Sequence, residues 1–257
     1  MANAGSKGIV RYVETFAQDT IAGGAAGGVG SAANGIAWLG SSWAGDTPIV
    51  RAVNTSRGLH ASGATDTTDG DMVEFCGDTL MFTGQTGHSS IETLIQFDVV
   101  STLAFNFGFN DTVLEGDGSS GSLPVELGGT TWVSNATAFL GFVFDVGADN
   151  DNLHCFWVNG GTDTTEAIAD LRMVGMAPTA SKWLYLKCEM QDRGSGKGVR
   201  AGFLAADHTG KSIHKEFDTT VARTTPLCFY YAWENRGSAA HVSYIKLPCW
   251  EQTIETV

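Results

Sequence analysis

The feature that most constrains this chain is a series of short apolar runs separated by Gly, Asp, Asn and Ser. The runs span residues 72–76, 79–83, 90–98, 102–109, 138–145, 153–158, 183–190, 199–204, 227–233 and 241–247. Several alternate with a period of two: Ile91, Thr93, Ile95 and Phe97 fall on one side of the run 90–98. Such runs predict short strands joined by turns. Because no long helical pattern alternates with them, we expect an all-β fold, an antiparallel β-sandwich, with one short helix at Thr164–Leu171.

No internal repeat and no Pro-rich or highly charged linker divides the chain. We therefore expect one sandwich domain over residues 17–257, preceded by an N-terminal arm or edge strand at residues 1–16. Residues 20–45 contain no charged side chain and are rich in Gly, Ala and Ser, which predicts a Gly-rich loop that leads into a buried strand. Gly28-Val-Gly30 within it resembles a dinucleotide-binding turn, but no long helix follows, so we reject a nucleotide site.

Composition excludes several classes of protein. The sequence is 43% hydrophobic, with 7 Trp and 14 Phe among its 257 residues, so it can bury a large core. A formal net charge of −13 repels phosphate backbones and anionic membrane surfaces, so we expect neither nucleic acid nor a membrane as a partner. Five separated cysteines without a CxxC pair predict reduced thiols packed as small apolar residues. With no apolar run typical of a signal peptide, they predict synthesis in a cytoplasm.

The spacing of potential metal ligands gives only weak evidence for a metal site. The six histidines show no HxH or HxxxH spacing. Asp145, Asp149 and Asp151 gather oxygen ligands in one loop and are weak calcium candidates, but the loop lacks the spacing and the terminal Glu of an EF-hand. A turn between two strands explains the same composition. We therefore predict no metal and no cofactor.

The order of the strands carries a resemblance to a known family. Ser90–Asp98 is followed by an aromatic-rich strand, Ala104–Asp111, then by Ala138–Asp145 and the Trp-bearing run Phe156-Trp157-Val158. This order resembles bacteriophage structural proteins that contain a concanavalin A-like jelly roll. The likeness covers roughly residues 70 to 250, and the start at Gly8–Phe16 is also similar to such virion proteins.

The resemblance implies a non-enzymatic capsid decoration or cement protein. Its partner would be the major capsid protein, on which it would sit as a homo-oligomer such as a trimer. Its location would be the virion, after synthesis in the host cytoplasm. An arm at residues 1–16 would add a strand to the sheet of a neighbour.

Two other functions stay open. A carbohydrate- or receptor-binding module of a head or tail fibre would stack exposed aromatic rings on sugars, and Trp132, in a polar Gly-Thr-Thr context, is the best exposed candidate. Trp157 and Trp233 lie inside apolar runs, which favours core packing for both.

A glycoside hydrolase is the last alternative, because some concanavalin-like jelly rolls are hydrolases with a Glu-x-Asp-x-x-Glu strand. Two carboxylates must face each other for that reaction. Glu115-Gly-Asp117 lacks the final carboxylate, and in Asp69-Gly-Asp71-Met-Val-Glu74 strict alternation sends Glu74 to the opposite face. We therefore predict no catalytic residues.

Overall fold

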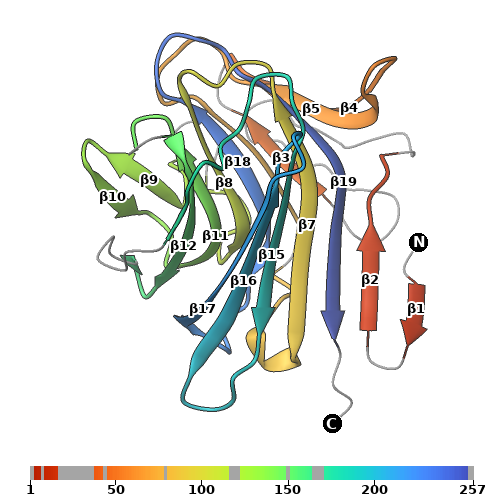
Figure 1. The fold of residues 1–257 in the computed structure, drawn as a ribbon, viewed down its shortest axis with the longest axis vertical. Coiled ribbons are helices and arrows are strands. Elements are labelled where there is room, and N and C mark those ends of the chain that lie inside the picture. The colour runs from red at the N-terminus through yellow and green to blue at the C-terminus, as the bar shows by residue number, and fades with distance from the viewer. Residues whose placement is uncertain are drawn as a thin grey trace.

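The computed structural model is built almost entirely of strands (Figure 1). It describes residues 3–6, 9–16, 38–42, 45–77, 80–115, 122–148, 151–163 and 171–253. Within these ranges the strands pair antiparallel, and a short 3-10 turn, η1 (Gly84–Thr86), precedes the strand at His88–Phe97. The prediction of an antiparallel β-sandwich is confirmed. No helix in the described ranges has the length and apolar character needed to cross a membrane.

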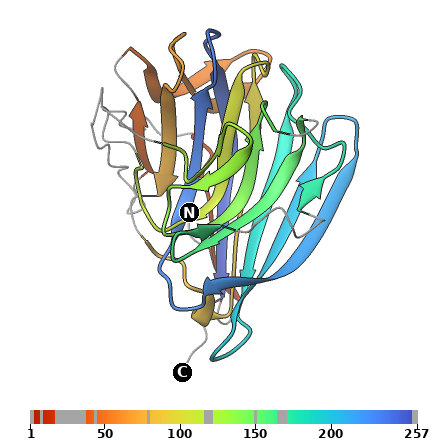
Figure 2. The ribbon, with the colours of Figure 1, turned by 90° about the vertical axis from the view of Figure 1, so that its left-hand side faces the viewer.

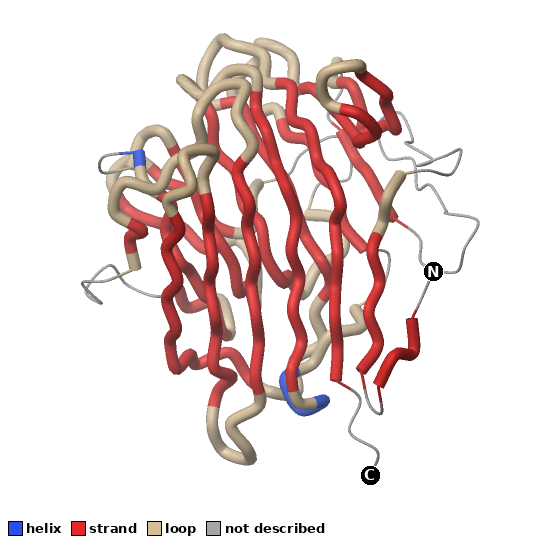
Figure 3. The backbone as a smooth tube through the Cα atoms, turned by 45° about the vertical axis from the view of Figure 1, so that its right-hand side comes forward, coloured by secondary structure: helices blue, strands red, loops and turns tan. Residues whose placement is uncertain are grey.

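The first layer is a sheet that has nine strands in the described part of the chain, called here the nine-stranded sheet. Its strands follow the order β1-β2-β19-β7-β15-β16-β17, and β5 pairs with both β19 and β4. Their bounds are β1 Asn3–Ser6, β2 Ile9–Val13, β4 Thr47–Asn54, β5 Gly58–Ala64, β7 His88–Phe97, β15 Leu184–Gln191, β16 Gly198–Ala206, β17 Ser212–Ala222 and β19 Val242–Thr253. The long strands run side by side across the front of Figure 3.

The second layer has eight strands among the described residues and is called the eight-stranded sheet. Its order is β13-β12-β11-β8-β18-β6-β3, and β14 also pairs with β12. The bounds are β3 Trp38–Ser42, β6 Met72–Gly77, β8 Leu103–Asn110, β11 Ala138–Asp145, β12 Leu153–Asn159, β13 Thr162–Asp163, β14 Arg172–Met173 and β18 Cys228–Asn235. A separate hairpin, β9 (Val125–Gly128) and β10 (Thr131–Ser134), lies beside this sheet in Figure 2.

The core lies between the two sheets and is lined by the alternating residues that the sequence pattern picks out. On β7, Ile91, Thr93, Ile95 and Phe97 are each at most 1% exposed. From the other sheet, aromatic side chains of β8, β11 and β18 meet them in one continuous cluster. Trp157 and Trp233 belong to that cluster, which confirms their core packing.

The sequence pattern did not predict several of the strands. β4, β5 and β17 belong to the nine-stranded sheet, whose outer side carries polar side chains, so their apolar signal is diluted. β17 shows this best, because inward Ile213 and Phe217 alternate with exposed His214 and Glu216. Of the expected helix at residues 164–171, all but Leu171 lie outside the described residues.

The two ends of residues 1–45 have definite places in the sheets. β1 and β2 form a hairpin that β2 attaches to β19, so the described part of residues 1–16 supplies the edge of the nine-stranded sheet. Residues 20–37 lie outside the described residues, and β3 follows them with Trp38 only 2% exposed. The prediction of a buried strand after the Gly-rich stretch is thus confirmed at Trp38. All five cysteines are buried and unbridged.

Two glycines set how closely β8 and β11 approach. Gly108 and Gly141 face each other in the antiparallel register. A Cβ atom on Gly108 would lie 2.3 Å from the Leu140 carbonyl oxygen and 2.5 Å from Gly141 Cα. Real Cβ atoms do not approach backbone atoms so closely, so any side chain at Gly108 must push the two central strands apart.

Replacing Gly108 by Ala is therefore expected to destabilise the fold by about 1–3 kcal/mol or more, the cost of overpacking a dense core. Gly77→Ala is the matched control, because a Cβ there would meet its neighbours at an ordinary 3.9 Å. Urea unfolding of both variants measures the difference. Equal midpoints for the two variants would contradict the close approach.

Candidate functional site

The outer face of the eight-stranded sheet is closed by the chain itself. Residues 111–137, which connect β8 to β11 and contain the β9–β10 hairpin, pack over it wherever they are described. Two apolar clusters form this contact, one around Leu123 and Tyr230 and one around Val125 and Phe156. Asn106 anchors the segment: its side chain donates to the Val125 carbonyl oxygen and accepts from the Val125 amide, both at 2.9 Å.

Trp132, the sugar-stacking candidate, is part of this cover. It is only 8% exposed and packs against His154 and Phe156, with ring centroids 5.1 and 5.6 Å away. The expectation that Trp132 is exposed is therefore wrong. Its polar neighbours Thr130 and Thr131 lie in the tight turn of the hairpin and at the start of β10, while the ring itself points back onto the sheet.

Glu74, the nearest approach to a hydrolase carboxylate, lies under the same cover and is fully buried. Its Oε1 accepts hydrogen bonds from the Tyr230 hydroxyl at 2.6 Å and from the Glu115 amide at 2.8 Å. Asn110 Nδ2 donates to Glu115 Oε1 at 2.7 Å. Burial raises the pKa of Glu115, and the charge of Glu74 adds to the rise. Asp117 lies outside the described residues. Within the described residues, Glu74 is therefore held in an internal hydrogen-bond network and is not exposed to solvent.

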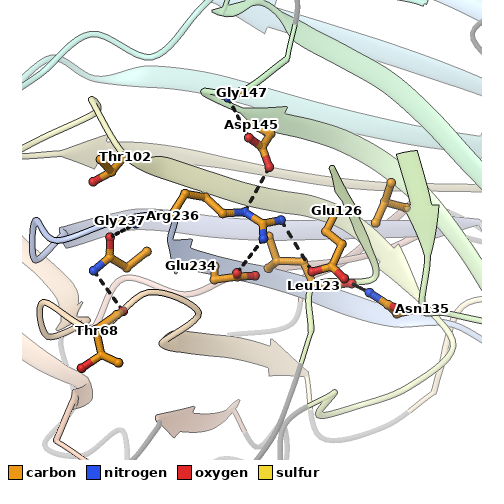
Figure 4. Close-up of polar contacts among 12 residues, drawn as sticks. Thr68, Thr102, Leu123, Glu126, Asn135, Asp145, Gly147, Glu234, Arg236 and Gly237 are labelled. Atoms are coloured by element: carbon orange, nitrogen blue, oxygen red, sulfur yellow. Dashed lines mark hydrogen bonds and ion pairs between the residues drawn. The ribbon is translucent and has the colours of Figure 1, made fainter. Parts of the chain in front are cut away.

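Arg236 lies at the end of the same sheet and binds three carboxylates (Figure 4). Its Nε donates to Asp145 Oδ2 at 3.1 Å, while its two terminal nitrogens lie 3.0 Å from Glu234 Oε1 and 3.5 Å from Glu126 Oε2. Asp145 also accepts from the Gly147 amide at 2.8 Å. One guanidinium must therefore balance three acidic groups, two of them only 4% exposed.

This arrangement bears on the weak calcium candidates. Both oxygens of Asp145 are engaged, one by Gly147 and the other by Arg236. Asp151 is exposed, and Asp149 lies outside the described residues. Among the described residues, the carboxylates whose oxygens gather in a group of three are those of Asp46, Asp66 and Asp71.

The outer face of the nine-stranded sheet, in contrast, carries a strip of aromatic, basic and amide side chains at the end near the β4–β5 hairpin. We call Arg57, Gln96, Trp183, Tyr244 and Lys246 the aromatic–basic strip. Tyr244 pairs with Gln96 across β19 and β7, and Trp183 directly precedes β15. Figure 3 looks onto this side of the sheet.

Contacts within the strip hold its members in place. The Arg57 guanidinium lies 4.0 Å above the centre of the Tyr244 ring, and its Nε donates to Gln96 Oε1 at 2.5 Å. Lys246 Nζ donates to the Arg57 carbonyl oxygen at 2.8 Å and lies 5.7 Å from the Trp183 ring centre. Trp183 keeps part of its surface exposed. No carboxylate of the described residues forms an ion pair with Arg57 or Lys246.

Sequence reasoning did not identify this strip. Its members come from a hairpin turn, the end of β7, the start of β15 and the middle of β19. The available signal was the outward parity of Tyr244 and Lys246, which alternate with buried Ser243 and Ile245. Only the pairing of the strands brings the five residues together.

Arg236→Met is expected to destabilise the protein by roughly 3 kcal/mol, because it leaves the buried carboxylate of Asp145 without a counter-ion. Arg200→Ala is the control. Arg200 is 47% exposed and pairs with Asp218 on the surface, so its loss should change stability little. Denaturant unfolding compares them. A midpoint for Arg236→Met close to that of Arg200→Ala would show that the three carboxylates do not depend on Arg236.

Glu234 is expected to make the stability of the folded protein depend on pH. Burial raises its pKa to about 7, against the lowering effect of Arg236. Between its ordinary value near 4.5 and pH 7, the folded protein holds a proton that the unfolded chain has lost, so this group makes stability fall as pH rises. Glu234→Gln should remove that contribution. Its stability relative to the parent should rise from pH 5 to pH 7.5, measured by urea unfolding at each pH. A constant difference would contradict the raised pKa.

Comparison with known proteins shows the fold but no family. No protein-family model matches the chain, and no curated protein matches its sequence. Among solved structures, a protein of unknown function, SO2946 from Shewanella oneidensis MR-1, is similar with a TM-score of 0.60 and 11% identity, covering 100% of this chain and 93% of the other. The PL-14 alginate lyase from Aplysia kurodai gives 0.53 and 10%, over 79% and 86%. Peanut lectin gives 0.51 and 9%, over 97% and 99%.

These matches confirm the concanavalin A-like jelly roll. The expected likeness to phage virion proteins finds no support in them. The chain therefore has the antiparallel sandwich fold that peanut lectin and the alginate lyase share.

Proposed function

We propose that this chain is a non-catalytic carbohydrate-binding module that holds a glycan on the aromatic–basic strip. The observation that carries the proposal is the partly exposed Trp183 ring, placed beside Lys246 on a sheet face that no other described segment covers. An indole offers a large, rigid and partly apolar surface at a small cost in conformational entropy. A pyranose ring stacked on it would lie near the Lys246 ammonium, which is 5.7 Å from the centre of the indole ring.

The charges of the strip indicate the class of glycan. A guanidinium binds a carboxylate through two parallel hydrogen bonds, and Arg57 is not ion-paired with any carboxylate in the described part of the chain. The net charge of −13 repels anions at long range, but at physiological ionic strength such repulsion is screened beyond roughly 8 Å. Local contacts therefore decide. They favour a uronate-bearing oligosaccharide over a neutral one.

The fold is compatible with this proposal without proving it. Peanut lectin and an alginate lyase share it, and both names refer to carbohydrate. A fold hosts many functions, so the argument depends on the strip itself. The capsid-decoration hypothesis rested on the resemblance, the lack of a credible active site and the reduced, acidic, strand-rich character of the chain, and none of the similar structures named above is a phage virion protein.

The proposal of binding without hydrolysis is supported by the other sheet. In the jelly-roll hydrolases, the reaction needs paired carboxylates open to the sugar chain. Here Glu74 is 0% exposed and is hydrogen-bonded to Tyr230 and Glu115 beneath the segment 111–137. On the aromatic–basic strip, no Asp or Glu is among the five residues.

Trp183→Ala is expected to weaken binding of polygalacturonate oligosaccharides at least tenfold, or about 1.4 kcal/mol, because a central aromatic anchor is lost. Trp183→Phe keeps a smaller ring and should retain part of the affinity. Isothermal titration measures both. Failure of the parent protein to bind acidic or neutral oligosaccharides, or full affinity in Trp183→Ala, would refute the proposal.

The charge preference has its own test with matched basic residues. Arg57→Ala should lower affinity for the acidic oligosaccharide and leave affinity for a neutral mannan oligosaccharide little changed. Arg200→Ala, at the other end of the same sheet face, is the control and should affect neither. Equal losses in the two variants would point to long-range charge instead of a contact in the strip.

Catalysis is separated from binding by incubating the parent protein with polygalacturonate. Elimination forms an unsaturated uronate that absorbs ultraviolet light, and hydrolysis releases reducing ends without that absorbance. We expect neither signal. Either one, lost in a variant of the strip, would make the chain an enzyme.

A further inference from the structure

We propose that Asp46, Asp66 and Asp71 form a binding site for a divalent cation, with Ca²⁺ as the ion that fits best. The site would lie at the junction of the two sheets. It involves none of the residues of the aromatic–basic strip, so it stands apart from the proposed carbohydrate binding.

The three carboxylates come from the ends of three strands. Asp46 directly precedes β4, Asp66 follows β5, and Asp71 directly precedes β6. One oxygen atom from each lies within 4.8 Å of the other two. Because β4 and β5 belong to the nine-stranded sheet and β6 to the eight-stranded sheet, an ion held here would tie both layers together.

The loop that carries Asp66 and Asp71 is already shaped by hydrogen bonds. The Asp66 amide donates to Asp46 Oδ1 at 2.7 Å, and the Thr68 amide donates to Asp66 Oδ1 at 2.5 Å. Asn235, fully buried, donates from Nδ2 to the carbonyl oxygens of Asp66 and Thr68, both at 3.1 Å. The backbone amide of Asn235 donates to the Asp71 carbonyl oxygen at 2.9 Å. The carboxylates are therefore held together before any ion binds, which lowers the cost of ordering them.

Asp71 supplies the independent sign of a missing ligand. The residue is only 4% exposed, and its Oδ2, which lies in the buried part of the residue, has no hydrogen-bond partner. Buried carboxylate oxygens are rarely left without a donor or a metal. No Lys or Arg of the described ranges forms an ion pair with Asp66 or Asp71. Arg236, which directly follows β18, is already ion-paired with Asp145, Glu126 and Glu234.

The backbone of Gly45 lies close to the Asp66 carboxylate. Gly45, with φ of +106°, has no side chain where a Cβ would lie 2.9 Å from Asp66 Oδ2. A set of oxygen ligands alone matches Ca²⁺ or Mg²⁺ better than Zn²⁺, whose protein sites are built mainly from Cys and His. Loop carboxylates of irregular geometry favour Ca²⁺, because Mg²⁺ demands a near-regular octahedron.

A proton shared between two of the carboxyl groups is the competing explanation for how Asp46, Asp66 and Asp71 can lie so close together. Burial raises the pKa of Asp71 to about 7, with a further rise from Asp66 and Asp46, so a proton between Asp71 and Asp66 would relieve the same repulsion. The two explanations differ in whether millimolar Ca²⁺ changes stability. A bound ion stabilises the folded protein with its concentration, whereas a carboxyl pair that needs only a proton does not respond.

The test is thermal unfolding of the metal-stripped full chain at pH 7.5 with 0 to 10 mM CaCl₂, and in parallel with MgCl₂. We expect the midpoint to rise with Ca²⁺ and to rise less with Mg²⁺. At a concentration 100 times the dissociation constant, the gain corresponds to a 100-fold shift of the folding equilibrium. Titration calorimetry of the folded protein with CaCl₂ should give one site per chain. No midpoint shift and no heat of binding would overturn the proposal.

Three variants locate the site. Asp71→Asn and Asp46→Asn should lose the Ca²⁺ response, and both should fold without the ion, because each removes one of three repelling charges. Asp151→Asn is the matched control in the loop of the weak calcium candidates and should respond like the parent. Loss of the response in Asp151→Asn, or its retention in both of the other variants, would place the ion elsewhere and contradict the assignment.

Discussion

The structure depends on the burial of the eight-stranded sheet on both of its faces. Every residue of β8, β11 and β18 is buried. One face packs against the nine-stranded sheet, and the other is covered by residues 111–137. Polar groups on that covered face must then find partners inside the protein, because water cannot reach them. Asn106 binding the Val125 backbone, Glu74 binding Tyr230, and Arg236 binding three carboxylates are three solutions to the same requirement.

This double burial decides which surface is open to a ligand. On the face that carries Glu74 and Trp132, the described part of segment 111–137 leaves these two side chains only 0% and 8% exposed. The nine-stranded sheet has one uncovered face, and there the side chains that alternate with the core ones are polar, charged or aromatic. A functional surface on this chain is therefore expected on long, regular strands as well as on loops. Sites on such strands hold their geometry better than sites on mobile segments.

The sequence predicted the fold better than the surfaces. Alternation along β7 and the aromatic runs of β8 and β11 identify strands because burial selects apolar residues every second position or throughout. The same logic misses β17, where exposed residues are charged, and it misjudges Trp132, whose polar neighbours occupy a turn while the ring packs inward. Arg57 and Trp183 are 126 positions apart, and no local pattern signals that strand pairing brings both to Tyr244 and Lys246.

The structure also shows that the acidic side chains are not all on the surface. From the sequence alone, the excess of Asp and Glu would be assigned to solvent-exposed loops. In the structure, Asp71, Glu74, Asp145 and Glu234 are each at most 4% exposed, so part of the net charge of −13 is internal. Internal carboxylates persist only where a donor, a cation or a proton compensates them. Glu74 has Tyr230, and Asp145 and Glu234 share Arg236. Asp71 has no basic partner among the described residues, and its Oδ2, like Glu234 Oε2, has no hydrogen-bond donor. By that comparison, the proposed cation would supply Asp71 with the positive charge that Arg236 supplies to Asp145 and Glu234.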